Sequence, residues 1–167
     1  MITIRIAQPE DAAAIADVHR VAFPGDAEAR FVEALVAEDD ALVSLVAVAE
    51  DEIIGHVLFS RMGIQGHGGE IAAVALAPIG VKPGWRRRGL AAALVEEGLR
   101  LCRERGDRIV LVLGDPGYYR RFGFAPAPGA IERPWPGPHF MALALTPGAL
   151  DGVAGRVGYP RAFDRLA

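Results

Sequence analysis

The stretch that decides the fold is residues 70–106, which read EIAAVALAPIGVKPGWRRRGLAAALVEEGLRLCRERG. Its first part, Glu70 to Val81, is almost continuously apolar, which predicts a central strand covered on both faces. Pro78 and Gly80 fit a regular strand ladder poorly, so we expect a bulge or a splayed edge near the end of this strand. Its last part, Leu90 to Arg105, has apolar residues at helical spacing and predicts a strong helix.

The loop between this strand and this helix is Val81 to Ala91, VKPGWRRRGLA. A strand, a short glycine-containing loop and a helix N-terminus together expose unpaired backbone N–H groups at the positive end of the helix dipole. Gly89 lets the backbone approach a ligand without an intervening Cβ, and the run from Arg86 to Arg88 adds fixed positive charge suited to a pyrophosphate. The segment predicts an anion-binding cradle, against the alternative of surface arginines that only cap a helix.

The composition limits the fold and the partners. The length of 167 residues and the hydrophobic fraction of 51% favour one folded domain over residues 1–167. The formal net charge of −3 weighs against nucleic acid as a partner, so any anion site must be local. The longest apolar runs reach about half of the roughly 18–20 residues that span a bilayer, so we expect no membrane partner.

The single cysteine, Cys102, excludes an internal disulfide and makes a reducing cytoplasm the expected setting. It lies in the middle of the predicted helix with no motif around it, so we expect packing rather than nucleophilic catalysis. The four histidines are scattered and, with one cysteine, give no metal-ligand spacing, so we expect no metal.

The rest of the pattern places further strands and helices around this unit. Ile2, Ile4 and Ile6 alternate with polar residues and predict a half-buried strand. The other expected strands are 42–49, 53–60, 108–113, 140–145 and a last short one around 153–159; the other expected helices are 12–22 and 27–38, with one or two helical turns at 118–122 and a Pro/Gly-rich loop at 126–138. This order predicts an α/β domain with a mixed sheet.

Two motifs resemble those of the GNAT superfamily of N-acetyltransferases. The loop is similar to its acetyl-CoA signature, [Q/R]-x-x-G-x-[G/A], with Arg86, Gly89 and Ala91 at the matching positions. The stretch LGDPGYYRRFGF, residues 113–124, resembles the late motif of that superfamily, in which a tyrosine precedes a Phe-Gly-Phe turn. The stretches GHVLFS (55–60) and FMAL (140–143) resemble a bacterial subgroup of the YhbS type. This resemblance implies a single GNAT-like α/β domain whose mixed, largely antiparallel sheet is flanked by helices and splayed at the acetyl-CoA site.

The resemblance also implies an activity, the transfer of an acetyl group from acetyl-CoA to a primary amine by direct attack. Tyr119 would protonate the leaving thiolate, unless the register slips by one and Tyr118 does so; a core tyrosine is the alternative for Tyr119. The splayed strand end would pair with the pantetheine amides, and the backbone N–H of Val81 or a neighbour would polarise the carbonyl. The implied cofactor-binding residues are Ile79, Gly80, Val81, Arg86, Arg87, Arg88, Gly89, Leu90 and Ala91.

The general base stays unassigned at this point. Many members of the superfamily use a carboxylate on the central strand, where this chain has Ala73 and Ala75 and carries an acid only at Glu70. Glu70, His67 and His56 are candidates, each with a hairpin, solvent-exposed or structural role as the alternative. A site that receives an amine already neutral is also compatible with the sequence.

Two other functions and the identity of the acceptor remain open. A non-catalytic acyl-CoA-binding or regulatory module would keep the fold and the cradle without a working base, whereas a nucleic-acid patch at the arginines conflicts with the acidic net charge. The acceptor can be a small-molecule or a peptide amine, and the chain a monomer or a homodimer. The resemblance places Asp26 and Glu28 beside the acceptor groove, where either could attract a cationic amine or simply face solvent.

Overall fold

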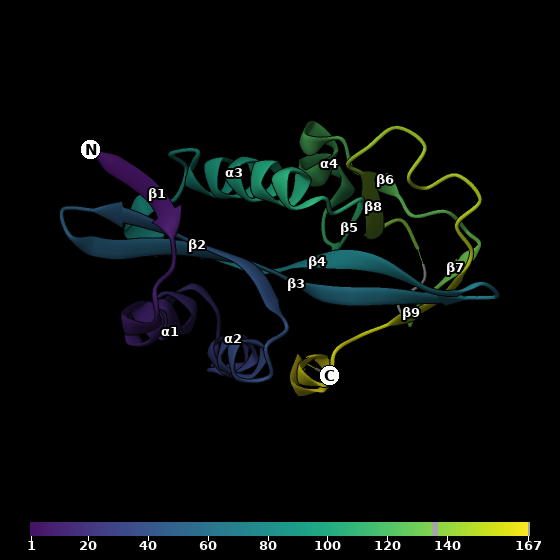
Figure 1. Cartoon of the computed structure of the whole chain (residues 1–167). Coiled ribbons are helices and arrows are strands. Elements are labelled where there is room, and N and C mark those ends of the chain that lie inside the picture. Colours follow the sequence, from purple (N-terminus) through teal and green to yellow (C-terminus); the bar gives the residue numbers. More distant parts are fainter. Residues whose placement is uncertain (135–136, 167) are drawn as a thin grey trace.

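The computed structural model describes residues 1–134 and 137–166, and within them nine strands form one mixed sheet with helices on both faces (Figure 1). The strands are β1 (Ile2–Ile6), β2 (Ala41–Ala49), β3 (Glu52–Gly66), β4 (Gly69–Val81), β5 (Ile109–Leu113), β6 (Ala125–Pro126), β7 (Ile131–Glu132), β8 (Phe140–Ala144) and β9 (Gly155–Gly158). The α-helices are α1 (Ala12–Ala22), α2 (Ala27–Ala37), α3 (Leu90–Arg105) and α4 (Pro116–Tyr119). Short 3-10 segments are η1 (Pro9–Asp11), η2 (Pro83–Trp85), η3 (Arg120–Phe122) and η4 (Arg161–Leu166).

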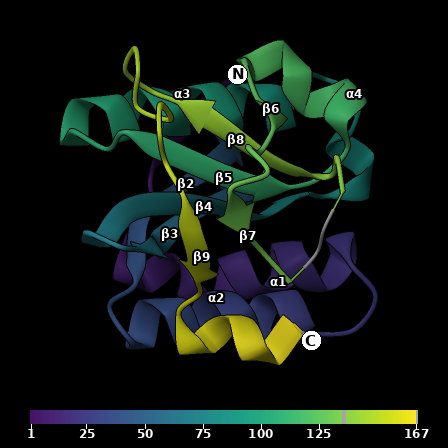
Figure 2. The same cartoon turned by 90° about the vertical axis from the view of Figure 1, so that its right-hand side faces the viewer.

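The helices form two layers. Helices α1 and α2 cover one face of the sheet and α3 covers the other, and the C-terminal segment η4 lies beside α2 (Figures 1 and 2). The core is divided accordingly: Phe59 and Leu94 belong to the cluster under α3, whereas Phe31, Leu35 and Leu58 belong to the cluster under α1 and α2. The sheet therefore separates two sides of the molecule, each with its own core cluster.

The sheet is mixed and mostly antiparallel, as predicted. Its main order is β1-β2-β3-β4-β5-β8-β6, and β9 pairs with β3 and β7. The central neighbours β4 and β5 are parallel, as are β7 and β9, and the other pairs are antiparallel. The crossover between β4 and β5 contains α3, as parallel neighbours require.

The two central parallel strands part soon after they meet. They pair at two positions, Val74 with Val110 and Ala75 with Leu111. Beyond these pairs β4 continues to Val81 along β3, while β5 continues to Leu113 along β8. The end of β4 therefore has an edge that β5 does not cover.

A bulge on β4 lies at the start of this opening. Between Phe59 and Val57 of β3, the register moves from Leu76 to Ile79 on β4, so Ala77 and Pro78 lie opposite Leu58 alone and β4 carries one extra residue. The irregularity expected near Pro78 is confirmed, and it turns the end of β4 away from β5.

Several predicted elements differ from the structure in extent. Strand β1 is largely exposed rather than half-buried, with Ile2 and Ile6 at 36% and 57% exposure, because it is an edge strand with one neighbour. Strand β3 runs past its predicted end at Ser60, since it pairs with β4 as far as Gly66. The predicted loop 126–138 contains the short strand β7, and its residues 135–136 lie outside the described residues.

Candidate active site

The loop from Val81 to Ala91 connects β4 to α3, as predicted. Gly89 caps the N-terminus of α3 with a φ of +76°, a conformation that glycine adopts without steric cost. The first hydrogen bond of the helix runs from the N–H of Ala93 to the carbonyl of Gly89 at 3.0 Å, so the N–H groups of residues 90–92 have no acceptor within the helix. A Cβ added at Gly89 would meet no heavy atom within 4 Å, so the space beside the backbone at this residue is open.

The arginines of the loop have different surroundings. Nε of Arg86 donates to the carbonyl of Val81 at 3.3 Å, and Nη2 donates to the carbonyl of Ala22 at 3.2 Å. Arg86 thus ties the end of β4 to the C-terminus of α1. The guanidinium of Arg88 stacks over the Trp85 ring, 4.9 Å from its centroid.

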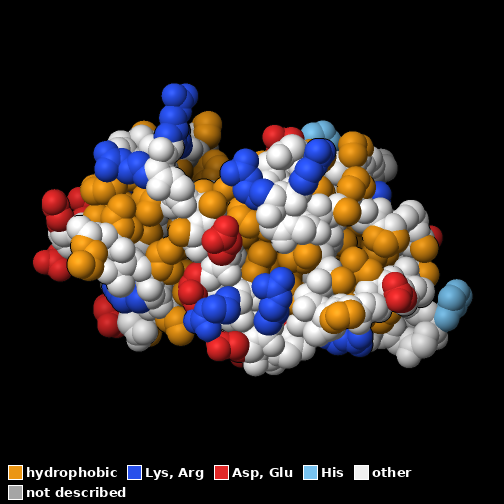
Figure 3. Space-filling model, turned by 90° about the horizontal axis from the view of Figure 1, so that it is seen from above, with side chains coloured by type: hydrophobic (Ala, Val, Ile, Leu, Met, Phe, Trp, Pro, Cys, Tyr) orange, Lys and Arg blue, Asp and Glu red, His pale blue; other side chains and the backbone are white. Residues whose placement is uncertain are grey.

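A cavity of about 260 Å³ lies in front of the loop. It is lined by Val81, Trp85, Arg86, Arg87, Gly89 to Ala92, Tyr118 and Arg121. We call it the loop cavity. It brings together most of the predicted cofactor-binding residues; Ile79, Gly80 and Arg88 are outside its lining. Figure 3, a view of the α3 side, shows the basic side chains in several separate groups with acidic ones between them, so the positive charge of the loop is local.

Arg121 is a loop-cavity residue that the sequence analysis did not assign. Its guanidinium lies 4.3 Å from the centroid of the Tyr118 ring, and its Nε donates to the carbonyl of Tyr118 at 3.0 Å. It brings a second source of positive charge to the cavity from a segment distant in sequence. The double arginine just before the Phe-Gly-Phe turn was the available signal.

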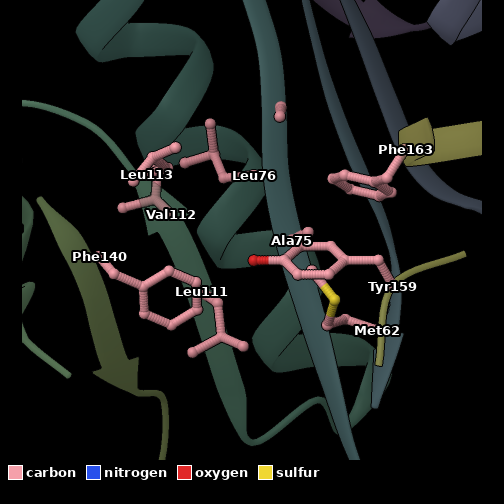
Figure 4. A pocket seen from close by; sticks show the side chains of 10 residues that line it. Met62, Ala75, Leu76, Leu111, Val112, Leu113, Phe140, Tyr159 and Phe163 are labelled. Atoms are coloured by element: carbon pink, nitrogen blue, oxygen red, sulfur yellow. The ribbon is translucent and has the colours of Figure 1, made fainter. Parts of the chain in front are cut away.

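A second cavity, of about 310 Å³, lies where β4 and β5 part, and we call it the strand cavity. Its lining residues are Met62, Ala75 to Ala77, Leu111 to Leu113, Phe140, Tyr159 and Phe163. Figure 4 shows Tyr159 and Phe163 on one side of it and Leu111 and Phe140 on the other. The described side chains that line this cavity are apolar except for the hydroxyl of Tyr159. Burial raises the pKa of Tyr159, so the phenol is neutral in the physiological range.

The two adjacent tyrosines of α4 face different surroundings. Tyr118 is at the loop cavity. Tyr119 packs over Gly114 at the end of β5, where an added Cβ would overlap its ring, and meets Phe124 edge-on at 5.8 Å. Burial, and secondarily Tyr118, raises the pKa of Tyr119 to about 12, which keeps its proton in place at neutral pH. Tyr119 thus lies next to the end of the strand that bounds the opening.

None of the three candidate bases lines the loop cavity or the strand cavity. Glu70 accepts a hydrogen bond from Gln65 at 2.5 Å and, like His67, belongs to the β3–β4 hairpin end. His56 is fully buried in β3. Its surroundings fit the alternative interpretation, a structural histidine on a strand whose ring nitrogens are satisfied by hydrogen bonds.

His56 belongs to a buried chain of hydrogen bonds under the end of β4. Its Nε2 is 2.8 Å from Oγ of Ser44, and its Nδ1 is 2.8 Å from Nε2 of His19. Burial lowers the pKa of His19 to about 4; burial and then the charge of His19 lower that of His56 to about 3. Nδ1 of His19 lies 3.0 Å from where a Cβ of Gly80 would be, so this pair supports β4 from the α1 side.

In the described part of the chain, three buried side-chain atoms have no hydrogen-bond partner: Nδ1 of His19, Oε1 of Glu28 and Oγ of Ser60. They come from α1, α2 and β3. Ser60 is two residues from both Leu58 and Met62 in β3, so its side chain lies on the same face of the sheet as theirs, the face opposite α3. Unpartnered polar atoms therefore gather on the side of the sheet away from the loop cavity.

Comparisons with known proteins agree with this geometry. A family model described as an acetyltransferase (GNAT) domain matches residues 3–127. The chain is 39% identical to the uncharacterized N-acetyltransferase YhbS of Escherichia coli, covering 98% of this chain and 99% of that protein. It is 33% identical to YjhQ of the same organism, over 82% of this chain and 76% of that protein.

Two solved structures extend this similarity to three dimensions. The crystal structure of E. coli YhbS in complex with CoA superposes with a TM-score of 0.92 at 38% identity, covering 99% of this chain and 93% of that one. A GNAT family acetyltransferase from Brucella melitensis in complex with acetyl-CoA gives a TM-score of 0.82 at 35% identity, covering 98% and 99%.

The described residues contain no group of three or more His, Cys, Asp or Glu side chains that could hold a metal ion. No helix among them has both the length and the apolar composition needed to cross a membrane.

Proposed function

Because the chain belongs to the GNAT family of N-acetyltransferases, we propose that it transfers the acetyl group of acetyl-CoA to a primary amine by direct attack. The observation that carries the proposal is the parting of β4 and β5 beside the loop at the N-terminus of α3. The CoA and acetyl-CoA complexes of the two similar structures support the choice of acyl donor.

The loop cavity suits the pyrophosphate of CoA. Backbone N–H groups at the start of α3, from Gly89 to Ala91, provide oriented donors and the positive end of the helix dipole. Arg87 and Arg121 add charge from two sides of the cavity. Arg86 acts differently, because its guanidinium is bonded to two backbone carbonyls and holds the loop in place.

The pantetheine arm then follows the edge of β4 that β5 leaves uncovered. Backbone groups of Ile79, Gly80 and Val81 pair with its amides as a further strand would, and bring the thioester to the opening. The backbone N–H of Val81 or a neighbour polarises the thioester carbonyl.

The reaction is a transfer between two nucleophiles. The lone pair of a neutral amine attacks the carbonyl carbon, a C–N bond forms, and the C–S bond breaks. The proton of Tyr119 goes to the departing thiolate, and the amine nitrogen gives up its extra proton to solvent. The ring of Tyr119, packed against Gly114, is held at the end of β5 where the leaving sulfur is expected.

A turnover assay tests the proposal. Purified protein is incubated with acetyl-CoA and a panel of primary amines, free CoA is measured with a thiol reagent, and N-acetylated products are identified by mass. We expect CoA release that depends on the amine. We also expect a product that is heavier than the amine because one acetyl group has replaced one hydrogen. Tight acetyl-CoA binding without transfer to any amine would contradict the proposal and favour a non-catalytic acyl-CoA-binding module.

A further inference from the structure

The strand cavity differs from the rest of the site in having apolar walls. We propose that the acceptor is an apolar primary amine, such as an arylalkylamine, that occupies the strand cavity and reacts in its neutral form without a base from the cavity wall. This inference rests on the proposed function and names the substrate class of the same site.

The size and lining of the cavity set the chemical class. Phe140, Phe163 and Tyr159 provide aromatic walls, with Leu111 beside Phe140 and Met62 beside Tyr159 (Figure 4). A volume of about 310 Å³ is at the lower end of the roughly 300–1,000 Å³ of ligand pockets, and suits one ring or a short branched chain. Burial of such a group against these walls is favourable, whereas a second ammonium group would be buried without a partner.

The position of the cavity favours the amine over the acyl chain as its occupant. Met62, Ala75 and Leu111 belong to the core cluster on the face opposite α3, and Phe163 packs against the same side. The loop cavity lies at the N-terminus of α3, on the other side. An acyl donor held from the α3 side leaves the opposite face of the opening to the acceptor.

The charge of the side chains that line the strand cavity determines the protonation state of the bound amine. Among the described residues that line the cavity, Tyr159 is the one that can ionise, and its pKa is raised by burial. The central strand has Ala75 in the cavity wall, where a carboxylate would have been a base. Apolar surroundings disfavour an ammonium ion and lower the pKa of a bound amine, so the cavity itself selects the neutral form.

Other titratable groups lie behind this wall. The buried pair of His19 and His56 is bonded to itself and to Ser44 under the end of β4. Glu28 has a buried, unpartnered Oε1 and precedes Phe31 by one helical turn; the Phe31 ring meets Phe163 at 4.7 Å. Glu28 is the carboxylate that a base-catalysed alternative would use.

A matched pair of amines tests the substrate class. 2-Phenylethylamine and 1,4-diaminobutane have similar lengths, but the second carries another charge in place of a ring. We expect kcat/KM to be at least ~10-fold higher for 2-phenylethylamine, because the cavity can bury a ring but not an unpaired charge. Equal or higher kcat/KM for 1,4-diaminobutane overturns the proposal.

Two variants locate the bound amine. Ala75→Val adds methyl groups inside the cavity, and Ala73→Val makes the same change two residues earlier on the same strand face, outside its lining. We expect Ala75→Val alone to raise KM for 2-phenylethylamine several-fold while leaving the affinity for acetyl-CoA unchanged. Equal effects of the two substitutions overturn the proposal, with thermal melting measured for both to detect unfolding.

The pH dependence tests the absence of a base. We expect log kcat/KM for 2-phenylethylamine to rise with unit slope from pH 6 to 9, roughly following the neutral fraction of the free amine, and to do so equally in Glu28→Gln. A plateau in this range that disappears in Glu28→Gln shows that the enzyme supplies a base and overturns the proposal.

Two further readouts separate this inference from the proposed function. Calorimetry of 2-phenylethylamine with protein saturated in CoA measures binding to the cavity without turnover. Saturable binding that Ala75→Val weakens supports the inference even if no amine is acetylated. The absence of saturable binding overturns it. A series of acetyl-, butyryl- and hexanoyl-CoA assigns the occupant. Preference for hexanoyl-CoA places the acyl chain in the cavity and overturns the proposal.

Discussion

The loop cavity and the strand cavity are built in opposite ways. The loop cavity is charged, and most of its lining comes from one continuous stretch around Gly89, with Tyr118 and Arg121 added from one further segment. The strand cavity is apolar, and its walls come from segments as distant as Met62 and Phe163. As proposed, the loop cavity binds the acyl donor, which the members of the family share, and the strand cavity receives the acceptor, which distinguishes one member from another. We therefore expect substitutions at the loop to change donor binding and substitutions around the opening to change turnover or acceptor choice.

The largest effect is expected at Tyr119, whose ring packs against Gly114 at the end of β5. Tyr119→Phe removes the proton that the leaving thiolate needs, and we expect kcat to fall by about 100-fold or more with little change in acetyl-CoA affinity. Tyr118→Phe is the matched control, since Tyr118 is at the loop cavity. A larger loss of kcat in Tyr118→Phe than in Tyr119→Phe would identify Tyr118 as the general acid. An unchanged kcat in both variants would show that neither tyrosine protonates the thiolate.

A smaller effect is expected at the loop. Gly89→Asp and Gly89→Asn have side chains of the same shape, and both residue types tolerate the positive φ of this position. We expect Gly89→Asp to weaken acetyl-CoA binding by roughly 100-fold relative to Gly89→Asn, because like charges about 4 Å apart repel by about 4 kcal/mol near a protein surface before salt screening. Calorimetry at two salt concentrations measures this difference. Equal affinities of the two variants would place the pyrophosphate elsewhere.

Protonation of the buried histidines is expected to have the smallest effect on the two cavities. It should still have a measurable effect on the free energy of unfolding. The pKa values of His19 and His56, about 4 and about 3 in the folded chain, lie below the ordinary value of 6.5. Well above pH 6.5 both are neutral in the folded and in the unfolded chain, and their protonation does not affect stability. Below it the unfolded chain takes up protons that the folded chain does not, so the free energy of unfolding falls until the pH reaches the folded pKa values.

Between pH 7 and pH 5, we expect this loss to be about 1–2 kcal/mol per histidine. Urea unfolding over this range measures it, and His56→Gln should make the dependence shallower while keeping a group that can bond to Ser44. An equally steep pH dependence in His56→Gln would contradict the assignment of the loss to this pair.

The same contrast explains what the sequence could predict. Arg86, Gly89 and Ala91 are neighbours in sequence, and local rules for helix N-termini place them around an anion without knowledge of the rest of the fold. Phe140 and Tyr159 meet in the strand cavity because β8 pairs with β5 and β9 pairs with β3, and no local pattern encodes such long-range pairings.

The hydrogen bond between His19 and His56 could not be predicted from the sequence either. His19 and His56 lie on a helix and a strand whose contact depends on the packing of α1 against β3, so the sequence could suggest a satisfied histidine but not its partner. The bulge near Pro78 was predictable because proline disrupts a strand ladder wherever it occurs.

The chain of Ser44, His56 and His19 has a consequence of its own. With both rings neutral, each carries one hydrogen, so the chain has two arrangements of opposite polarity. In one, Ser44 donates to His56, His56 donates to His19, and Nδ1 of His19 carries a hydrogen beneath Gly80. In the other every hydrogen bond is reversed and Nδ1 presents a lone pair. The orientation of the Ser44 hydroxyl in β2 therefore determines the tautomer of both histidines. Through Nδ1 of His19 it sets the sign of the electrostatic potential at the end of β4, where the thioester is proposed to lie.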